Sequence, residues 1–210
     1  LAKISMRQWT GNAPSPDTTA MIVGDVVAII DARLPGSYEE NVAGINIGLV
    51  RALGTPNPVT TSIVSGPDAP RPAPAVRSVG QSMGRIDDLY ENGNDSAHIQ
   101  VQRVVDPATG QGRWIAMIPG TATFSWNART PLDGSGNVAA AAGLVSGGEV
   151  AVRDALRDAM QREGVLGKGE PVMLVGHSQG GMVMTNLARR RSDGLNAVSY
   201  THLRAHETSL

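Results

Sequence analysis

The first third of the chain shows hydrophobic residues at the spacing of two helices. Residues 15–17 place a hydroxyl, a proline and a carboxylate in the order that starts a helix. The apolar positions after them predict one helix that ends at Pro35 and a second helix over residues 39–53. We therefore expect an N-terminal helical hairpin over residues 1–54. Residues 55–75 contain six prolines, a composition that predicts a linker.

The middle of the chain changes from helical to strand periodicity. Apolar residues at helical spacing predict a third helix over residues 76–90. Alternating apolar residues at 99–105, a turn at 106–112 and an apolar run at 114–118 then predict a β-hairpin that leads into a buried strand. The Gly, Ala and Ser-rich stretch that continues to residue 148 predicts no defined element.

The last part of the chain alternates between helix and strand. Residues 149–163 have the apolar spacing of an amphipathic helix. The apolar run at 171–175 lies between glycines and predicts a strand buried on both faces, and a helix resumes from Gln179 to about residue 191. This order predicts an α/β fold in which helices flank a mostly parallel sheet, with residues 76–197 forming a partial domain.

Composition narrows the classes of protein that the chain can belong to. Of its 210 residues, 41% are hydrophobic and 18% are charged, which predicts a folded, soluble chain, and no apolar run is long enough for a transmembrane segment. The net charge of −1 argues against a nucleic acid or an anionic membrane as partner. The absence of cysteine excludes disulfides and thiol nucleophiles, and we see no metal-ligand cluster and no phosphate-binding loop, so we expect neither a metal nor a cofactor.

Both ends of the chain carry signs that they are not the natural ends. The sequence begins with Leu1 and lacks a leader pattern, so we expect the true start to be missing. Residues 198–208 read as the in-frame translation of a transposase end sequence used in sequencing libraries. We therefore interpret residues 198–210 as an artefactual tail, with a genuine short tail as the alternative, and leave them out of the fold. His202 and His206 lie in this tail.

The motif with the clearest chemistry is Gly-x-Ser-x-Gly, formed by Gly176, Ser178 and Gly180. It lies where the predicted strand ends and the next predicted helix begins, the context of a nucleophile elbow rather than a chance match in a glycine-rich chain. A side chain two positions before or after the serine would collide with the neighbouring strand or helix. We expect Ser178 to be the nucleophile and the Gln179 N–H to be an oxyanion donor at the helix N-terminus.

A second oxyanion donor is expected in the loop after an earlier strand. Pro119, Gly120 and Thr121 end the predicted strand at residues 114–118. Glycine allows the backbone to approach a ligand closely, and the Thr121 N–H and hydroxyl both donate hydrogen bonds. Thr121 is therefore the candidate, and a simple turn is the alternative reading of the Pro-Gly pair.

A serine nucleophile needs a histidine base and a carboxylate that orients it. Asp193 follows Ser178 too closely to lie after the next strand, and His177 is expected to pack in the sheet. His98 is expected at the surface. We therefore expect the base and the acid to be missing and the chain as given to be catalytically incompetent.

Residues 98–196 resemble the lipase and esterase branch of the α/β-hydrolase superfamily. The likeness rests on a hairpin, a strand ending in Gly-Thr, one helix, and the Gly-His-Ser-x-Gly-Gly elbow. Class 3 lipases carry an arginine where this chain has Pro119. The resemblance implies an α/β-hydrolase-type sheet that is incomplete at its C-terminus, and a serine ester hydrolase that forms an acyl-enzyme on Ser178, with Gln179 and Thr121 as oxyanion donors.

The resemblance also implies a small-molecule or lipid ester as substrate. Two alternatives remain open. One is a non-catalytic binding protein with the same fold, because a fold alone does not guarantee chemistry. The other is an acyltransferase or thioesterase that uses the same elbow. For the N-terminal helices we favour a packing role.

Overall fold

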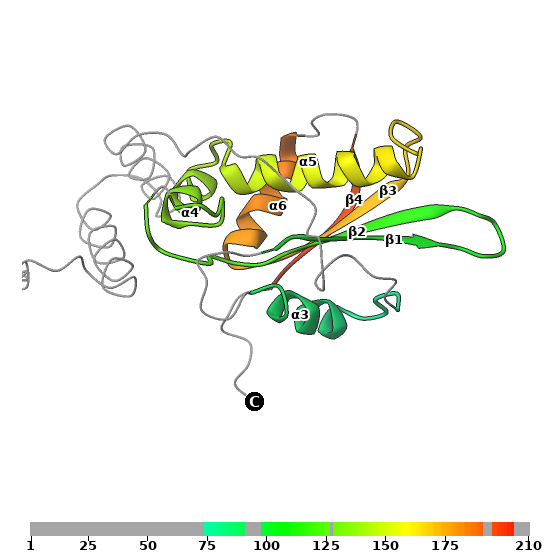
Figure 1. Ribbon diagram of the computed structural model, residues 1–210, viewed down its shortest axis with the longest axis horizontal. Coiled ribbons are helices and arrows are strands. Elements are labelled where there is room, and N and C mark those ends of the chain that lie inside the picture. The colour runs from blue at the N-terminus through cyan, green and yellow to red at the C-terminus, as the bar shows by residue number, and fades with distance from the viewer. Residues whose placement is uncertain (1–73, 91–97, 127, 191–194, 204–210) are drawn as a thin grey trace, which may run out of the picture.

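The computed structural model describes residues 74–90, 98–126, 128–190 and 195–203, the last six by their backbone only. The N-terminal helical hairpin and nearly all of the linker that the sequence predicts lie outside these residues. The elements of the described part, in chain order, are α3 (Val79–Asp87), β1 (Gln100–Val105), β2 (Gly112–Ile118), α4 (Gly134–Ala141), α5 (Gly147–Arg162), β3 (Pro171–His177), α6 (Gln179–Arg190) and β4 (Asn196–Leu203) (Figure 1).

The four strands form one mostly parallel sheet in the order β1-β2-β3-β4. β1 and β2 make the predicted hairpin, with Gln100 opposite Met117. β3 runs parallel to β2, with Trp114 opposite Val172, and β4 runs parallel to β3. The predicted α/β class and the mostly parallel sheet are therefore confirmed.

Helices cover both faces of this sheet. In Figure 1, α4, α5 and α6 lie on one side of the strands and α3 lies on the other. Side chains along a strand alternate between the two faces, so Ala116 and Ile118 of β2 join the cluster beneath α5 and α6, while Met117 packs with Ile86 of α3. Burial on both faces explains why β2 and β3 are continuous apolar runs.

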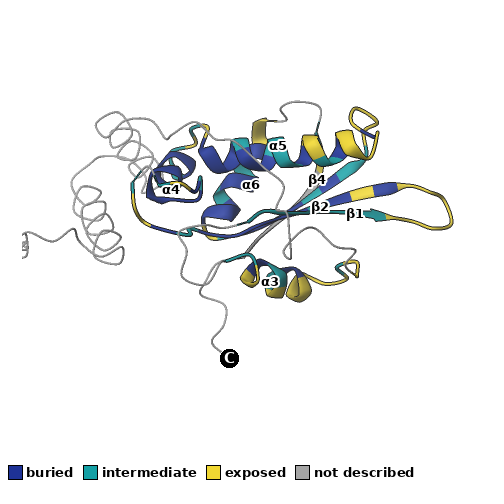
Figure 2. Cartoon of the chain, in the orientation of Figure 1, coloured by how far each residue is buried: buried dark blue, intermediate teal, exposed yellow. Residues whose placement is uncertain are grey.

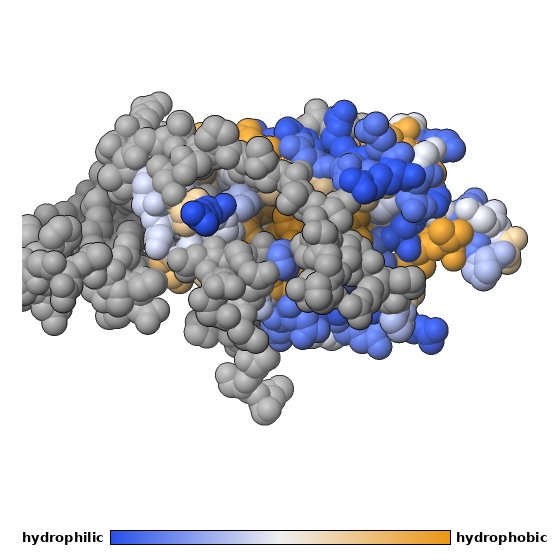
Figure 3. Space-filling view, in the orientation of Figure 1, coloured by the Kyte–Doolittle hydropathy of each residue, from blue (hydrophilic) through white to orange (hydrophobic). Residues whose placement is uncertain are grey.

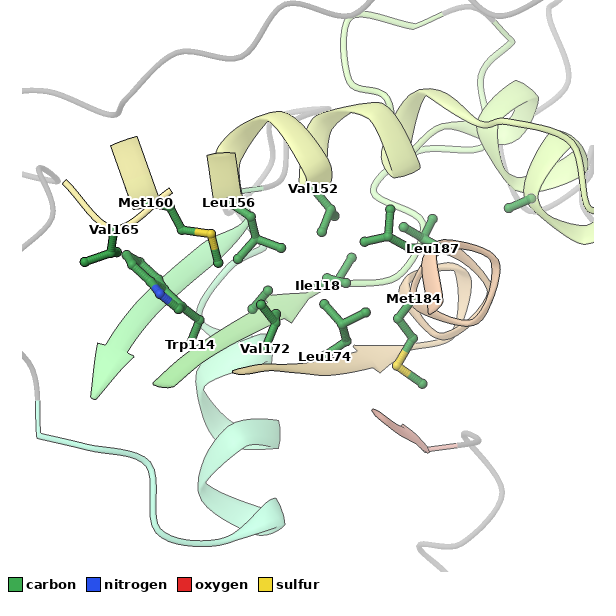
Figure 4. Close-up of a cluster of buried hydrophobic side chains, with 13 residues drawn as sticks. Trp114, Ile118, Val152, Leu156, Met160, Val165, Val172, Leu174, Met184 and Leu187 are labelled. Carbon is green, nitrogen blue, oxygen red and sulfur yellow. The ribbon is translucent and has the colours of Figure 1, made fainter. Parts of the chain in front are cut away.

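The larger core cluster lies between the sheet and the helices α4, α5 and α6 (Figure 4). Its best buried members are aliphatic and come from two strands and two helices. They are Ile118, Val152, Leu156, Val172, Leu174, Val183 and Met184. Figure 2 shows that the buried residues of α5 and α6 lie on the side of each helix that faces the strands. In Figure 3 the outer sides of the two helical layers are mostly hydrophilic, and hydrophobic residues are visible between them.

The two ends of α5 follow the local rules for starting and stopping a helix. The Ser146 hydroxyl caps the helix by accepting a hydrogen bond from the N–H of Glu149 at 3.2 Å. Gly164 has φ +66°, a left-handed conformation that glycine adopts without steric cost, and the Val165 N–H returns to the carbonyl of Met160 at 2.9 Å. The predicted helix and its glycine stop are confirmed.

Helix α4 is absent from the elements that the sequence predicts. Its N-cap is Asp133, whose carboxylate accepts hydrogen bonds from the Gly136 N–H and the Ser135 hydroxyl, both at 2.7 Å. Two glycines in its first turn weaken the helical pattern, but packing requires them. A Cβ on Gly134 would lie 2.5 Å from the carbonyl oxygen of Phe124, and a Cβ on Gly136 would lie 2.4 Å from that of Pro131.

Strand β4 extends beyond residue 197, where the predicted domain ends. It starts at Asn196 and its backbone runs beside β3 as far as Leu203. The backbone of residues 198–203 is thus part of the sheet, although the sequence analysis left these residues out. Among the helices that the structure describes, we find none with the length and apolar character that a bilayer crossing requires.

Candidate active site

Ser178 occupies a strained turn between β3 and α6. Its φ is 51°, and among the described residues it is the only one other than glycine with a positive φ. An L-residue avoids this left-handed region because its Cβ crowds the following carbonyl. The Ser178 carbonyl accepts the first hydrogen bonds of α6, from the N–H groups of Gly181 at 2.9 Å and Met182 at 3.3 Å. The Ser178 side chain is exposed, as expected of a nucleophile raised above the sheet edge.

The two glycines of the motif have the predicted steric role. A Cβ on Gly176 would lie 2.4 Å from the carbonyl carbon and oxygen of Gly180. A Cβ on Gly180 would lie 2.3 Å from the carbonyl oxygen of Ile118 and 2.5 Å from that of Pro119. These contacts are with backbone atoms, which cannot rotate away as a side chain would. The prediction of a collision with the neighbouring strand or helix is therefore confirmed.

Gln179 follows the serine, starts α6 and is fully buried. It is the first residue of α6, so its N–H has no partner within the helix and lies at the positive end of the helix dipole. The side chain is fully buried and packs against the first turn of α4, since a Cβ on Gly136 would lie 3.0 Å from its Nε2 atom. Neither amide atom of Gln179 has a hydrogen-bond partner among the described residues. The role of the Gln179 N–H as an oxyanion donor stays a prediction.

The loop after β2 lies against the serine. A Cβ on Gly120 would lie 2.9 Å from the Cβ of Ser178, so this loop passes the elbow at the distance that only glycine allows. The next residue, Thr121, accepts a hydrogen bond at its Oγ1 from the Nδ2 of Asn137 at 2.7 Å. The Ala122 N–H donates to the carbonyl of Leu132 at 2.8 Å. The role of Thr121 as an oxyanion donor stays a prediction.

Tyr90 also reaches the elbow, although the sequence analysis assigned it only an apolar position in a helix. It lies just after α3, on the opposite side of the sheet from α5 and α6. Its Oη accepts a hydrogen bond from the Gly120 N–H at 2.5 Å and lies 3.4 Å from the Nδ1 of His177. Burial raises the pKa of the Tyr90 phenol, the Gly120 hydrogen bond opposes that rise, and the charge of Asp87 adds to it. The phenol is therefore protonated at neutral pH.

The Ser178 hydroxyl has no base paired with it among the described side chains. No hydrogen bond there joins the Ser178 hydroxyl to an imidazole or a carboxylate. His177 is half-buried at the end of β3, in keeping with the expectation that it packs in the sheet. His98 is also half-buried, and its N–H pairs with the carbonyl of Leu89 at 3.1 Å, so its expected place at the surface stays a prediction.

The other residues considered as base or acid cannot be placed. Asp193 and His206 lie outside the described residues, and only the backbone of His202 is described, within β4. The described part of the chain brings together no group of three or more His, Asp or Glu side chains able to hold a metal ion.

Comparisons of the chain with protein-family models, with curated proteins and with solved structures returned no match.

Proposed function

We propose that the chain carries the nucleophile elbow of an α/β-hydrolase-type serine hydrolase that acts on carboxylic esters, either small molecules or lipids. The observation that carries this proposal is the exposed Ser178 at φ 51° between a buried parallel strand and a helix. Strain of about 1–3 kcal/mol at one residue persists only where the surrounding structure imposes it, and it concentrates at functional sites. The two glycines that admit this turn support the same interpretation.

The reaction follows from the groups around the serine. The Ser178 oxygen attacks the ester carbonyl carbon, its proton passes to a base, and the carbonyl electron pair moves onto the oxygen. The N–H groups of Gln179 and Thr121 stabilise that oxyanion. Collapse of the tetrahedral intermediate expels the alcohol and leaves an acyl-enzyme, which water cleaves to release the acid and restore the serine.

The same geometry serves an acyltransferase or a thioesterase, because these reactions share the acyl-enzyme and differ in the acceptor or the leaving group.

A non-catalytic binding protein is favoured by a different observation. Within the described residues no base is hydrogen-bonded to Ser178. Reactivity of the serine separates this second candidate from the enzymes.

The test is site-resolved labelling with a fluorophosphonate, read by peptide mass spectrometry, with and without added imidazole as an external base. We expect Ser178 to be labelled faster than the other exposed serines, and imidazole to accelerate its labelling. Ser178→Ala should abolish this signal. Ser125→Ala is the matched control, because Ser125 is exposed in the loop between β2 and α4. If Ser178 reacts no faster than Ser125 at any imidazole concentration, the hydrolase proposal is wrong and the binding protein is favoured.

A further inference from the structure

The Tyr90 hydroxyl and Ser178 both lie against Gly120. A Cβ on Gly120 would be 2.8 Å from the Tyr90 Oη and 2.9 Å from the Ser178 Cβ. Because both atoms lie within 3 Å of one point, the phenol oxygen lies beside the turn that carries Ser178. Tyr90 packs on the face of the sheet that α3 covers, and its hydroxyl reaches Gly120, two residues after the end of β2.

Among the described residues, the hydrogen of the Tyr90 phenol pairs with His177 only through a long hydrogen bond. A phenol donates one hydrogen bond and accepts others. The Gly120 N–H already donates to the oxygen, so the hydrogen must point elsewhere. The His177 Nδ1 lies 3.4 Å from the phenol oxygen, beyond the 2.5–3.2 Å range of good hydrogen bonds. A hydroxyl that accepts one hydrogen bond is polarised and donates a stronger one.

We infer that Tyr90 is a further catalytic residue of this site, whose hydroxyl donates a hydrogen bond to the substrate oxygen that becomes negative when Ser178 attacks. This inference rests on the proposed hydrolase function. The Gly120 N–H is occupied by the phenol oxygen, so Tyr90 replaces that amide as a donor and acts beside the N–H groups of Gln179 and Thr121. An aromatic ring without the hydroxyl would fill the same space but would supply no donor.

The first measurement compares Tyr90→Phe with the unaltered chain in the fluorophosphonate assay with imidazole. Phosphonylation also places negative charge on an oxygen beside Ser178, so removal of one donor should slow labelling by about 10- to 100-fold. An equal labelling rate would overturn the inference while leaving the hydrolase proposal intact. Absence of Ser178 labelling in the unaltered chain would overturn both.

A second measurement separates donation from mere support of the Gly120 loop. Fluorotyrosines at position 90 keep the oxygen that accepts the Gly120 N–H but make the phenol more acidic. If the hydroxyl donates in the reaction, labelling becomes faster while the phenol is protonated and declines at a lower pH than in the unaltered chain, where the phenol ionises. A supporting role predicts the same pH profile for every tyrosine analogue, and that result would overturn the inference even if Tyr90→Phe is slow or unstable.

Discussion

Replacing Gly180 by alanine should destabilise the protein, although the same change usually strengthens a helix. The new Cβ would lie 2.3 Å from the Ile118 carbonyl oxygen, whereas ordinary contacts begin at 3.4 Å, so α6 or the end of β2 must move by about 1 Å. Overpacking of this kind costs typically about 1–3 kcal/mol, and two backbone carbonyls place this case near the upper end. The higher helix propensity of alanine offsets about 1 kcal/mol of this cost. We expect a net loss of about 2 kcal/mol.

Gly84→Ala is the matched control for this prediction. Gly84 is also helical, in α3, but a Cβ there would meet nothing within 4 Å. Its replacement should therefore stabilise the protein by about 0.5–1 kcal/mol. The same chemical change thus has opposite signs at two helical positions, and only the contact with the end of β2 differs.

Urea unfolding of the two variants and the unaltered chain measures both effects as changes in the unfolding free energy, at equal slopes against urea concentration. The labelling rate of Ser178 should fall in Gly180→Ala and stay unchanged in Gly84→Ala, because a shift of α6 moves the oxyanion donors. If Gly180→Ala proves as stable as Gly84→Ala, the steric account of the elbow is wrong.

Three further predictions concern strain and charge. Ser178→Gly should be more stable than Ser178→Ala by about 1 kcal/mol in urea unfolding. Both variants lack the hydroxyl, but only glycine adopts the φ of 51° without steric strain. Equal stability of the two variants would contradict this. Hydrogen bonds from Arg103 lower the pKa of Glu170. The ionised Glu170 therefore stabilises the folded protein fully above the ordinary glutamate pKa, and this stabilisation is lost as pH falls through the lowered folded-state pKa. Glu170→Gln should therefore cost about 1–2 kcal/mol at pH 7 and flatten the loss of stability in acid, whereas an unchanged acid profile would refute this assignment. Burial raises the pKa of Glu149 despite its ion pair with Arg190, so the unfolding free energy increases as pH falls from the raised pKa toward the ordinary glutamate value. Glu149→Gln should therefore lower the unfolding free energy at pH 7 by less than Glu170→Gln does, and it should remove this increase in acid. A larger loss than that of Glu170→Gln would show that the ion pair outweighs the burial of the carboxylate.

Elements that depend on local signals were predictable. The spacing of apolar residues in α5 and the glycine stop after it act within a few residues, as does the change from strand to helix around Ser178. Helix α4 was not predictable in this way, because its glycines lower helix propensity and are required by carbonyls of Phe124 and Pro131 in a preceding loop. The structure puts Gly120, the residue before Thr121, against Ser178, and the role of Thr121 as a donor stays a prediction.

The elbow itself was determined by the sequence alone, because a strand, a serine, a helix and two small residues at fixed spacing permit one tight turn. The residues that lie around Ser178 were decided only by the tertiary structure. Tyr90 and His177 are 87 positions apart in the chain, yet their side chains meet because α3 packs on one face of the sheet and β2 lies beside β3. No periodicity encodes such a contact, since it arises from the pairing of strands and the docking of a helix.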